Sequence, residues 1–378
     1  MHRPQRVIVS GYYGFSNIGD EAILLSLHKA LCQEIPDSEL LVLSANPEQT
    51  TKEHGVQSIS RVDFLGLIKG LLKADLLISG GGSLFQDGTS SRSLYYYLLV
   101  IFMSWLFHVP VLIYAQGIGP IKSSFNLKLT GWVLKLVNQV TVRDEESLKA
   151  VQSMGYKGKV ECTADPVMAL PPEPRDEGEA ILASLNWPDS SLMGPIIGIS
   201  LRPWHGVERF LDQLEDLILR LLSEQDARIV LIPMHYPGDD ALTNDLLKRF
   251  SRQQAIRILP QQVSASSMIS IIGCLNLVIG VRLHALIFAA IAGTPAIAVS
   301  YDPKVDHFAQ RVRQINIGNI ARVDAQELWE QTIDLLKNEG VIRAQTLQIC
   351  AELRQLAYIP AKRAAAILAK SEGGMSNG

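Results

Sequence analysis

Two series of short apolar runs constrain the fold of this chain more than any other feature. Longer amphipathic stretches separate the runs, such as residues 21–33, 127–137 and 145–152. This alternation is typical of parallel sheets whose strands are joined by helices. In the first series we expect strands at 6–10, 40–43, 76–79, 111–114, 139–142 and 160–163. In the second series we expect them at 196–200, 229–232, 256–259, 277–279 and 296–300.

The composition changes between the two series, where Pro, Asp, Glu and Ser become frequent, and this indicates a linker. A chain of 378 residues is also longer than one core usually spans. We therefore expect two doubly wound, Rossmann-like α/β domains that face each other across a cleft. The predicted boundaries are 1–175 for the first domain, 176–194 for the linker, 195–340 for the second domain and 341–378 for a C-terminal helical segment.

Charge and cysteine content exclude several classes of protein. The formal net charge is −3 and no run of Lys and Arg stands out, so the basic footprint of a nucleic-acid binder is missing. The four cysteines are far apart and form no CxxC pair, which argues against a zinc site or a disulfide framework. We expect a reduced, cytoplasmic setting, because the N-terminus also lacks the pattern of a signal peptide. No HExxH, GxSxG or metal-ligand spacing occurs, so we expect no metal site.

The segment 94–107, "LYYYLLVIFMSWLF", is almost entirely apolar, with only Ser104 clearly polar. It is too short to span a bilayer as a helix. Two interpretations remain open. The segment is either a helix buried between the sheet and the second domain or an aromatic-rich helix that contacts a membrane surface.

Glycine-rich loops follow three of the predicted strands of the first series, at 11–20, 80–88 and 116–120. In doubly wound sheets, ligands bind outside the carboxyl ends of the strands. Glycines there let the backbone come close to a ligand and leave amide groups directed at it. The candidate ligand contacts on these loops are Gly14, Asn17, Asp20, Gly81, Gly82, Gln86 and Gln116.

The first of these loops, "GYYGFSNIGDEAIL", has the glycine spacing of a P-loop but the opposite charge. Gly14 and Gly19 are followed by Asp20 and Glu21, where a P-loop has Lys and then Ser or Thr. A helix N-terminus attracts anions, and two carboxylates in its first turn repel a phosphate. Sugar hydroxyls suit this loop better, with Asp20 as a hydrogen-bond acceptor or a base. The alternative is that Asp20 only caps the helix.

The predicted strand ends of the second series carry cationic side chains instead. They supply Arg202, His235, Arg282, His284 and Lys304. Arginine offers a planar fork for a carboxylate or a phosphate, and lysine offers a point charge. Each residue alone could be a solvated charge or a satisfied histidine, but together they indicate an anion-binding half. His284 opens a predicted helix, and its imidazole can donate or accept a proton near neutrality.

At these residues the sequence resembles the polysaccharide pyruvyltransferase family, and in particular the bacterial cell-wall enzymes that serve S-layer anchoring. The resemblance extends from Gly11 to about Phe308 and rests on "GYYGFSNIGDEAIL", "SGGGSLFQD", "QGIGP", "VRDEES", "SLRPW", "GVRLHALIFAA" and "YDPKV". It implies a GT-B-like fold and a transfer of pyruvate from phosphoenolpyruvate, as co-substrate, to a sugar. The product would be a 4,6-linked ketal, on N-acetylmannosamine in a polymer or a lipid-linked precursor, and no further cofactor is implied.

The resemblance also implies that Arg143, His284 and Lys304 bind or activate the donor. We expect the second domain, with Arg202, Arg282 and His235, to bind phosphoenolpyruvate, and the first to bind the acceptor. The enzyme would then work in the cytoplasm, at the inner face of the membrane if the acceptor is lipid-linked, and as a homo-oligomer or alone. Two other functions remain open: a glycosyltransferase that uses a nucleotide-sugar, and a non-catalytic protein that binds envelope glycans.

Overall fold

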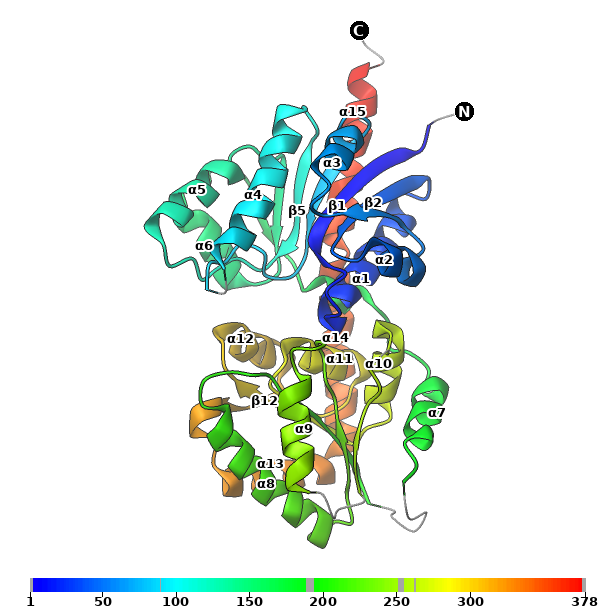
Figure 1. Ribbon diagram of the computed structural model, residues 1–378, viewed down its shortest axis with the longest axis vertical. Coiled ribbons are helices and arrows are strands. Elements are labelled where there is room, and N and C mark those ends of the chain that lie inside the picture. Colours follow the sequence, from blue (N-terminus) through cyan, green and yellow to red (C-terminus); the bar gives the residue numbers. More distant parts are fainter. Residues whose placement is uncertain (1–2, 89, 188–193, 251–254, 262, 376–378) are drawn as a thin grey trace. The chain divides into compact units, whose positions relative to one another are not determined.

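The computed structural model describes residues 3–375 apart from 89, 188–193, 251–254 and 262, and it divides into two α/β units (Figure 1). Unit 1 comprises Met1–Phe15, Asp20–Ala169 and Leu353–Gly378. Unit 2 comprises Ser16–Gly19 and Leu170–Glu352. Two parts of the chain therefore differ from the predicted boundaries. A short piece of the first glycine loop groups with unit 2, and the end of the chain returns to unit 1.

Unit 1 contains a seven-stranded parallel sheet with the order β3-β2-β1-β4-β5-β6-β7. All six predicted strands of the first series are confirmed, and β3 is additional. Its sequence, QSIS, has no alternation of apolar residues that would predict a strand. The strands are β1 Gln5–Tyr13, β2 Ser38–Ser44, β3 Gln57–Ser60, β4 Leu76–Gly80, β5 Val111–Gln116, β6 Gln139–Val142 and β7 Val160–Cys162.

Helices cover both faces of this sheet. One core cluster joins the sheet to α3, α4, α5 and α6, so these four helices share one face. The last helix, α15, packs on β4 and β5 from the other face (Figure 1). The helices of unit 1 are α1 Ile18–Glu34, α2 Pro47–His54, α3 Phe64–Leu71, α4 Ser91–Leu106, α5 Ser124–Leu134, α6 Glu145–Ser153, the short 3-10 helix η1 Pro166–Ala169, and α15 Ile359–Met375.

The apolar segment 94–107 forms most of α4, and it is buried on one side only. Leu94, Leu98 and Ile101 lie in the core cluster, whereas Trp105 and Leu106 are exposed on the other side. In the part of the chain that the structure describes, no helix is both long and apolar enough to cross a membrane. The predicted packing of this helix on the sheet is therefore confirmed for one side, and burial against the second domain stays a prediction.

Unit 2 contains a six-stranded parallel sheet with the order β10-β9-β8-β11-β12-β13, which is the doubly wound order. The five predicted strands of the second series are confirmed, and β13 is additional at an edge. Its sequence, INIGN, contains two asparagines and a glycine, so it lacks the apolar run that would predict a strand. The strands are β8 Ile196–Ser200, β9 Arg228–Leu231, β10 Ile256–Ile258, β11 Leu277–Gly280, β12 Ala296–Ser300 and β13 Ile315–Asn319.

The stretch 176–194 was predicted as a linker, but its first half is helical. Helix α7 packs on α10, and the backbone N–H of Gly178 donates to Oγ of Ser270 at 2.8 Å. Residues 188–193 lie outside the described part. The helices of unit 2 are α7 Asp176–Ser184, α8 Val207–Glu224, α9 Asp240–Arg249, α10 Ala265–Gly273, α11 Leu283–Ala292, α12 Pro303–Val312, η2 Ile320–Arg322 and α13 Ala325–Lys337. Helix α14, Glu339–Ala357, contains the passage from unit 2 to unit 1.

Docking of α15 generates a test of this return to unit 1. Ala364 is fully buried, whereas Ala366 in the same helix is exposed. Ala364→Asp places an unpaired charge in an apolar contact, and we expect it to lower the free energy of unfolding by about 2–4 kcal/mol. Ala366→Asp, which changes helix propensity equally, should lower it by less than about 0.7 kcal/mol. Urea unfolding measures both, and equal losses would show that α15 is not docked as described.

Candidate functional site

Each sheet reverses its strand order beside its first strand, and this brings two loops together at each reversal. In unit 1, β1 pairs with β4, so the loop that contains Gly14 lies next to the loop that begins at Gly81. In unit 2, β8 pairs with β11, so Arg202 and Arg282 follow neighbouring strands. Such reversals are where doubly wound sheets bind ligands.

In unit 1, the loop after β4 packs tightly on the start of α1. Gly81 has a φ of +29°, and a Cβ there would lie 2.2 Å from Cγ2 of Ile23. Gly82 has a φ of +76°, and its Cβ would lie 3.2 Å from Oδ1 of Asp20. The glycines therefore serve both a left-handed backbone and a close approach. As a result, the carboxylate of Asp20 lies beside the backbone of the glycine loop.

Asp20 lies in the first turn of α1, and the N-cap position before this helix is occupied by Asn17. The helix begins at Ile18, and Oδ1 of Asn17 accepts a hydrogen bond from the N–H of Gly19 at 3.2 Å, which is the contact of an N-cap. Burial raises the pKa of the phenols of Tyr13 and Tyr97, and the charge of Asp20 raises both pKa values further. The phenols of Tyr13 and Tyr97 therefore remain protonated at neutral pH, and the side chain of Asp20 beside them is half-buried.

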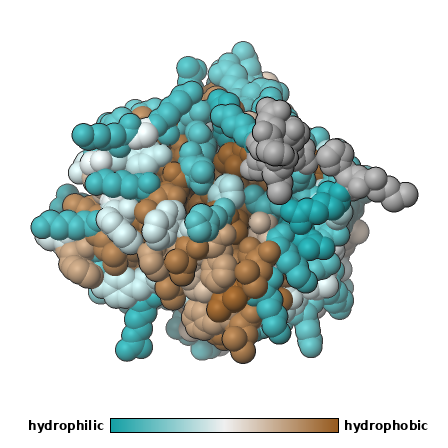
Figure 2. Space-filling view, turned by 90° about the horizontal axis from the view of Figure 1, so that it is seen from above, coloured by the Kyte–Doolittle hydropathy of each residue, from teal (hydrophilic) through white to brown (hydrophobic). Residues whose placement is uncertain are grey.

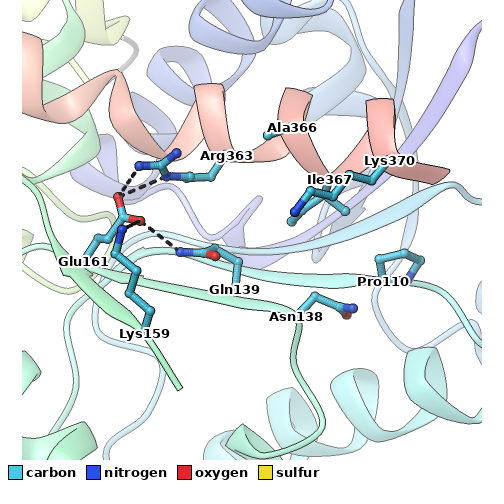
Figure 3. A pocket seen from close by; sticks show the side chains of 9 residues that line it. All are labelled: Pro110, Asn138, Gln139, Lys159, Glu161, Arg363, Ala366, Ile367 and Lys370. Carbon is cyan, nitrogen blue, oxygen red and sulfur yellow. Dashed lines mark hydrogen bonds and ion pairs between the residues drawn. The ribbon is translucent and has the colours of Figure 1, made fainter. Parts of the chain in front are cut away.

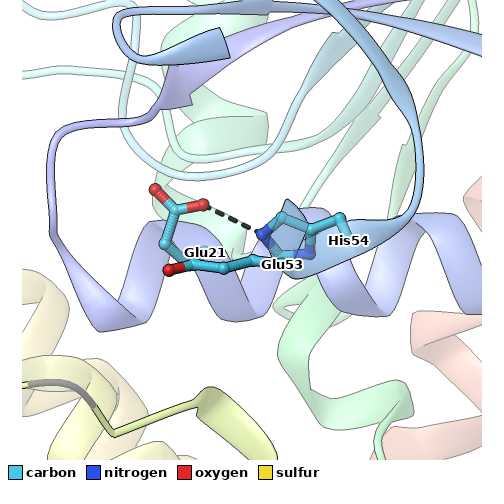
Figure 4. Close-up of side chains that lie close together, drawn as sticks. All are labelled: Glu21, Glu53 and His54. Atoms are coloured by element: carbon cyan, nitrogen blue, oxygen red, sulfur yellow. Dashed lines mark hydrogen bonds and ion pairs between the residues drawn. The ribbon is translucent and has the colours of Figure 1, made fainter. Parts of the chain in front are cut away.

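Glu21 has a structural use within unit 1. Its Oε1 accepts from the N–H of Gly14 at 2.8 Å, and its Oε2 lies 3.1 Å from Nε2 of His54 (Figure 4). Glu53 completes a group whose potential metal-ligand atoms lie within 4.8 Å of one another. Because Glu21 and His54 hold the glycine loop against the end of α2, we assign the group to the fold.

Gln116 and Arg143 organise the loops at the carboxyl edge of the first sheet. Gln116 is fully buried, and its Nε2 donates to the carbonyl oxygen of Gly82 at 3.1 Å. We therefore expect it to act by fixing the glycine loop. Arg143 donates to Oγ of Ser83 at 2.9 Å and to Oδ2 of Asp165 at 3.0 Å, so it links the loops after β4, β6 and β7. Gln86 is half-buried on the loop after β4.

The charge of Arg143 is balanced inside unit 1. Only 6% of its side chain is exposed, and Asp144 lies 3.3 Å from its Nε in addition to Asp165. Burial alone would lower the pKa of this guanidinium, but the two carboxylates outweigh burial and raise it. Gly117 leaves the necessary room, since a Cβ there would lie 2.7 Å from Nη2 of Arg143.

The middle of the first glycine loop packs with unit 2. The N–H of Ile18 donates to the carbonyl oxygen of Met234 at 2.9 Å, and Asn17 forms an antiparallel bridge with His235. Gly19 lies directly against His284, since a Cβ at Gly19 would be 2.0 Å from Nδ1 of that ring. Asn17, which was predicted on the acceptor side, thus lies beside His235, which was predicted on the donor side.

His284 lies in the first turn of α11, as predicted from the sequence. The helix begins at Leu283, and all its residues other than His284 and Ala292 are buried. Free backbone N–H groups at such a helix end favour an anion. The helix therefore fixes the backbone of His284 rigidly, and Gly19 limits where the ring can move.

Arg282 forms a buried ion pair that fixes the loop after β9. Asp239 is fully buried, and its Oδ2 accepts from Nε of Arg282 at 3.0 Å and from the N–H groups of Met234 and His235, each at 3.1 Å. A second contact joins Nη2 of Arg282 to Oδ1 of Asp239. The fork of Arg282 is thus occupied by a carboxylate of the protein, and it supports the backbone next to His235.

Arg202 and Lys304 are brought together around Tyr301, a residue that sequence reasoning did not single out. Nη1 of Arg202 donates to the phenol of Tyr301 at 3.1 Å, and Nζ of Lys304 lies 5.4 Å from the centroid of that ring. Lys304 also lies 3.3 Å from Oδ2 of Asp302, which caps α12. Arg202 has no carboxylate partner among the described residues. The position of Tyr301 directly after β12, inside "YDPKV", was the available signal.

A separate pocket of about 450 Å³ lies at the opposite, amino edge of the first sheet (Figure 3). It lies between α15 and the starts of the strands, where Arg363 pairs with Glu161 at 2.9 Å. Its lining contains none of the predicted site residues. The candidate site therefore remains at the carboxyl edges of the two sheets.

Comparisons with known proteins identify the family and the fold. The family described as "Polysaccharide pyruvyl transferase" matches residues 17–303. The amylovoran biosynthesis protein AmsJ of Erwinia amylovora is 24% identical over 288 residues, which are 72% of this chain and 66% of the length of AmsJ.

Solved structures show the fold alone, because their sequence identities are low. HepE of Anabaena, solved with UDP-glucose, has a TM-score of 0.65 at 13% identity, over 97% of this chain and 99% of that one. The UDP-GlcNAc 2-epimerase of Neisseria meningitidis has a TM-score of 0.62 at 13% identity, over 97% of this chain and 100% of that one. The ADP-heptose heptosyltransferase II of E. coli has a TM-score of 0.53 at 15% identity, over 89% of this chain and 99% of that one. The predicted GT-B-like architecture is thereby confirmed.

The contact between Gly19 and His284 predicts an effect on stability. We expect Gly19→Ala to lower the free energy of unfolding by about 1–3 kcal/mol, because the new methyl group would overlap the ring. Its carbon would lie 2.8 Å even from Cβ of His284, so a change of ring orientation does not remove the overlap. In Gly273→Ala, whose Cβ meets nothing closer than 3.8 Å, we expect a gain of about 0.5–1 kcal/mol. Urea unfolding would contradict the contact if both variants gained stability.

Proposed function

This chain belongs to the polysaccharide pyruvyl transferase family, so it is a transferase, and from that premise we propose its donor, product and catalytic residues. The donor is phosphoenolpyruvate, used without a further cofactor. The acceptor is a sugar of a cell-envelope polysaccharide or of its lipid-linked precursor, with N-acetylmannosamine in an S-layer-anchoring polymer as the first choice. The products are a 4,6-pyruvate ketal and phosphate.

The observation that carries the proposal is the group of cations at the carboxyl edge of the second sheet. Arg202 and Lys304 both border Tyr301, and His284 opens α11. Phosphoenolpyruvate carries a carboxylate and a phosphate, so it needs more than one cation, and guanidinium and ammonium groups suit these anions. Because Arg282 is paired with Asp239, we propose that it supports the site from behind, through His235.

The proposed reaction has two steps. The methylene carbon of phosphoenolpyruvate takes a proton, and a sugar hydroxyl attacks the neighbouring carbon and loses its own proton. Phosphate then leaves with the electrons of the carbon–oxygen bond, and a second hydroxyl of the same sugar closes the ketal and loses its proton. We propose that His284 supplies the first proton or contacts the phosphate. Lys304 stabilises the negative charge on the leaving phosphate. Arg143, whose charge is paired with Asp144 and Asp165, instead supports the loops of unit 1 from behind.

Unit 1 supplies the proposed acceptor side. Its glycine loops hold backbone groups beside Asp20, near the neutral phenols of Tyr13 and Tyr97. Gly14, Gly81, Gly82 and Gln86 would shape this surface, and a carboxylate there suits sugar hydroxyls as an acceptor or base. The cleft between the two domains, in which donor and acceptor would meet, stays a prediction.

A phosphate-release assay with phosphoenolpyruvate and a panel of saccharide acceptors tests the donor assignment. We expect release to require both substrates, and His284→Ala and Lys304→Ala each to slow it at least about 100-fold, because each removes a preorganised charge or proton donor. Lys337→Ala, an exposed lysine of α13, is the matched control and should keep full activity. Full activity in both site variants would remove the assignment.

Thermal shifts, together with the phosphate-release assay, separate the two alternative functions. A ligand at 100 times its Kd stabilises the native state by roughly 2.7 kcal/mol, so thermal shifts reveal which donor binds. A shift with UDP or UDP-glucose and none with phosphoenolpyruvate would indicate a glycosyltransferase. Binding of glycan and phosphoenolpyruvate without phosphate release across the whole panel would indicate a glycan-binding protein.

Asp20→Asn tests the acceptor side. We expect it to raise the KM for the acceptor about tenfold or more, because the lost charge weakens the hydrogen bonds to sugar hydroxyls, and to leave the Kd for phosphoenolpyruvate unchanged. Asn17→Ala is the comparison, since Asn17 packs beside His235 in unit 2 and should affect donor binding more. Weakened donor binding in Asp20→Asn would show that the whole loop serves the donor.

A further inference from the structure

The exposed sides of α3, α4 and α5, which we call the aromatic face, are apolar to an unusual degree. Of the fourteen large hydrophobic side chains exposed in the described residues, ten lie between Val62 and Trp132. They include Leu65, Leu106 and Phe125, which are 72%, 56% and 66% exposed. Figure 2 shows hydrophobic side chains gathered in one broad area, on the side where these helices lie in Figure 1. Gatherings of this kind mark interaction surfaces.

Two helices of the aromatic face, α4 and α5, contact each other through partly exposed side chains, and α3 shares their core. Phe102 of α4 lies 5.8 Å, centroid to centroid, from Trp132 of α5 and 5.7 Å from Trp105. The phenol of Tyr95 donates to Oδ1 of Asn126 at 2.8 Å. Leu67 of α3 lies in the same core cluster as the buried side of α4. The exposed apolar side chains thus belong to one continuous layer of helices.

The charged side chains of α3, α4 and α5 are all cationic. The helices α3, α4 and α5 contain no Asp or Glu. They and their ends carry the exposed cations Lys69, Lys73, Arg92, Lys128 and Lys135.

Two acids just before α3 and α4 have structural uses. Asp63 caps α3 through the N–H of Gly66 at 2.9 Å. Asp87 accepts from the N–H of Lys122 at 2.7 Å and so holds the start of α5.

We infer that the aromatic face docks the protein on an anionic lipid bilayer, lying in the interface without crossing it. Trp and Tyr favour the headgroup region, and clustered Lys and Arg are attracted to anionic headgroups. A second copy of the chain fits less well, because a two-fold contact would place the same cations opposite one another. This surface goes beyond the predicted contact of the single segment 94–107, since it adds α3, α5 and a requirement for negative charge.

Vesicle flotation tests the inference. We expect the full chain to float with vesicles of phosphatidylcholine and phosphatidylglycerol but not with phosphatidylcholine alone, and added salt to weaken the binding. Leu106→Glu with Phe125→Glu should lower the vesicle partition coefficient by about tenfold or more, and Lys128→Glu with Lys135→Glu should do the same. The controls are Val341→Glu, on an exposed apolar residue of unit 2, and Lys29→Glu, on α1.

Two further measurements make the result decisive. Phosphate release with a water-soluble acceptor should be unchanged in all variants, so failure of the chemistry and failure of docking are separate results. Absence of binding to the anionic vesicles, or equal losses in the control variants, would overturn the inference. So would a dimer of the wild-type chain that Leu106→Glu with Phe125→Glu dissociates, because the face would then be covered by a second copy.

Discussion

The reversal of strand order at β1 and β4, and again at β8 and β11, is the constraint on which the site depends. Strands that follow one another along the chain usually lie side by side, but at these two points the next strand lies on the other side of the first. The loops that follow the two neighbouring strands diverge at such a reversal, and doubly wound sheets bind their ligands there. The glycine loops of unit 1 and the cationic loops of unit 2 both occupy such positions.

The distribution of charge then separates residues that build the edge from residues that are available to a ligand. Arg143 and Arg282 are held by Asp165 and Asp239, so each cation is already compensated inside its own unit. A buried ion pair of this kind fixes loops more than it adds stability. Arg202 differs, because its partner is the phenol of Tyr301 and not a carboxylate. The guanidinium of Arg202 is therefore the proposed donor contact of unit 2 that no carboxylate of the described residues occupies.

Much of this arrangement could be predicted from the sequence, because apolar runs and turn residues report local structure directly. The strands, the two doubly wound units and the place of His284 at the start of a helix follow from such local patterns, whereas the GT-B-like fold follows from the resemblance to the family. Three features do not. β3 and β13 are short polar edge strands, whose pairing depends on their neighbours. Helix α7 is held by α10, and the grouping of Ser16–Gly19 with unit 2 depends on hydrogen bonds to residues more than two hundred positions away.

The return of the chain to unit 1 has a consequence for how the protein can be divided. The chain passes between the units within the first glycine loop, after Ala169 and again within α14, so neither unit is one continuous piece of sequence. A fragment that ends near residue 175 would lack α15, and the apolar side chains of β4 and β5 beneath that helix would face water. The first half of the chain therefore does not contain the whole of unit 1. In synthesis from the ribosome, the seven strands of the first sheet emerge early, but the helix that packs on β4 and β5 emerges only with residues 359–375.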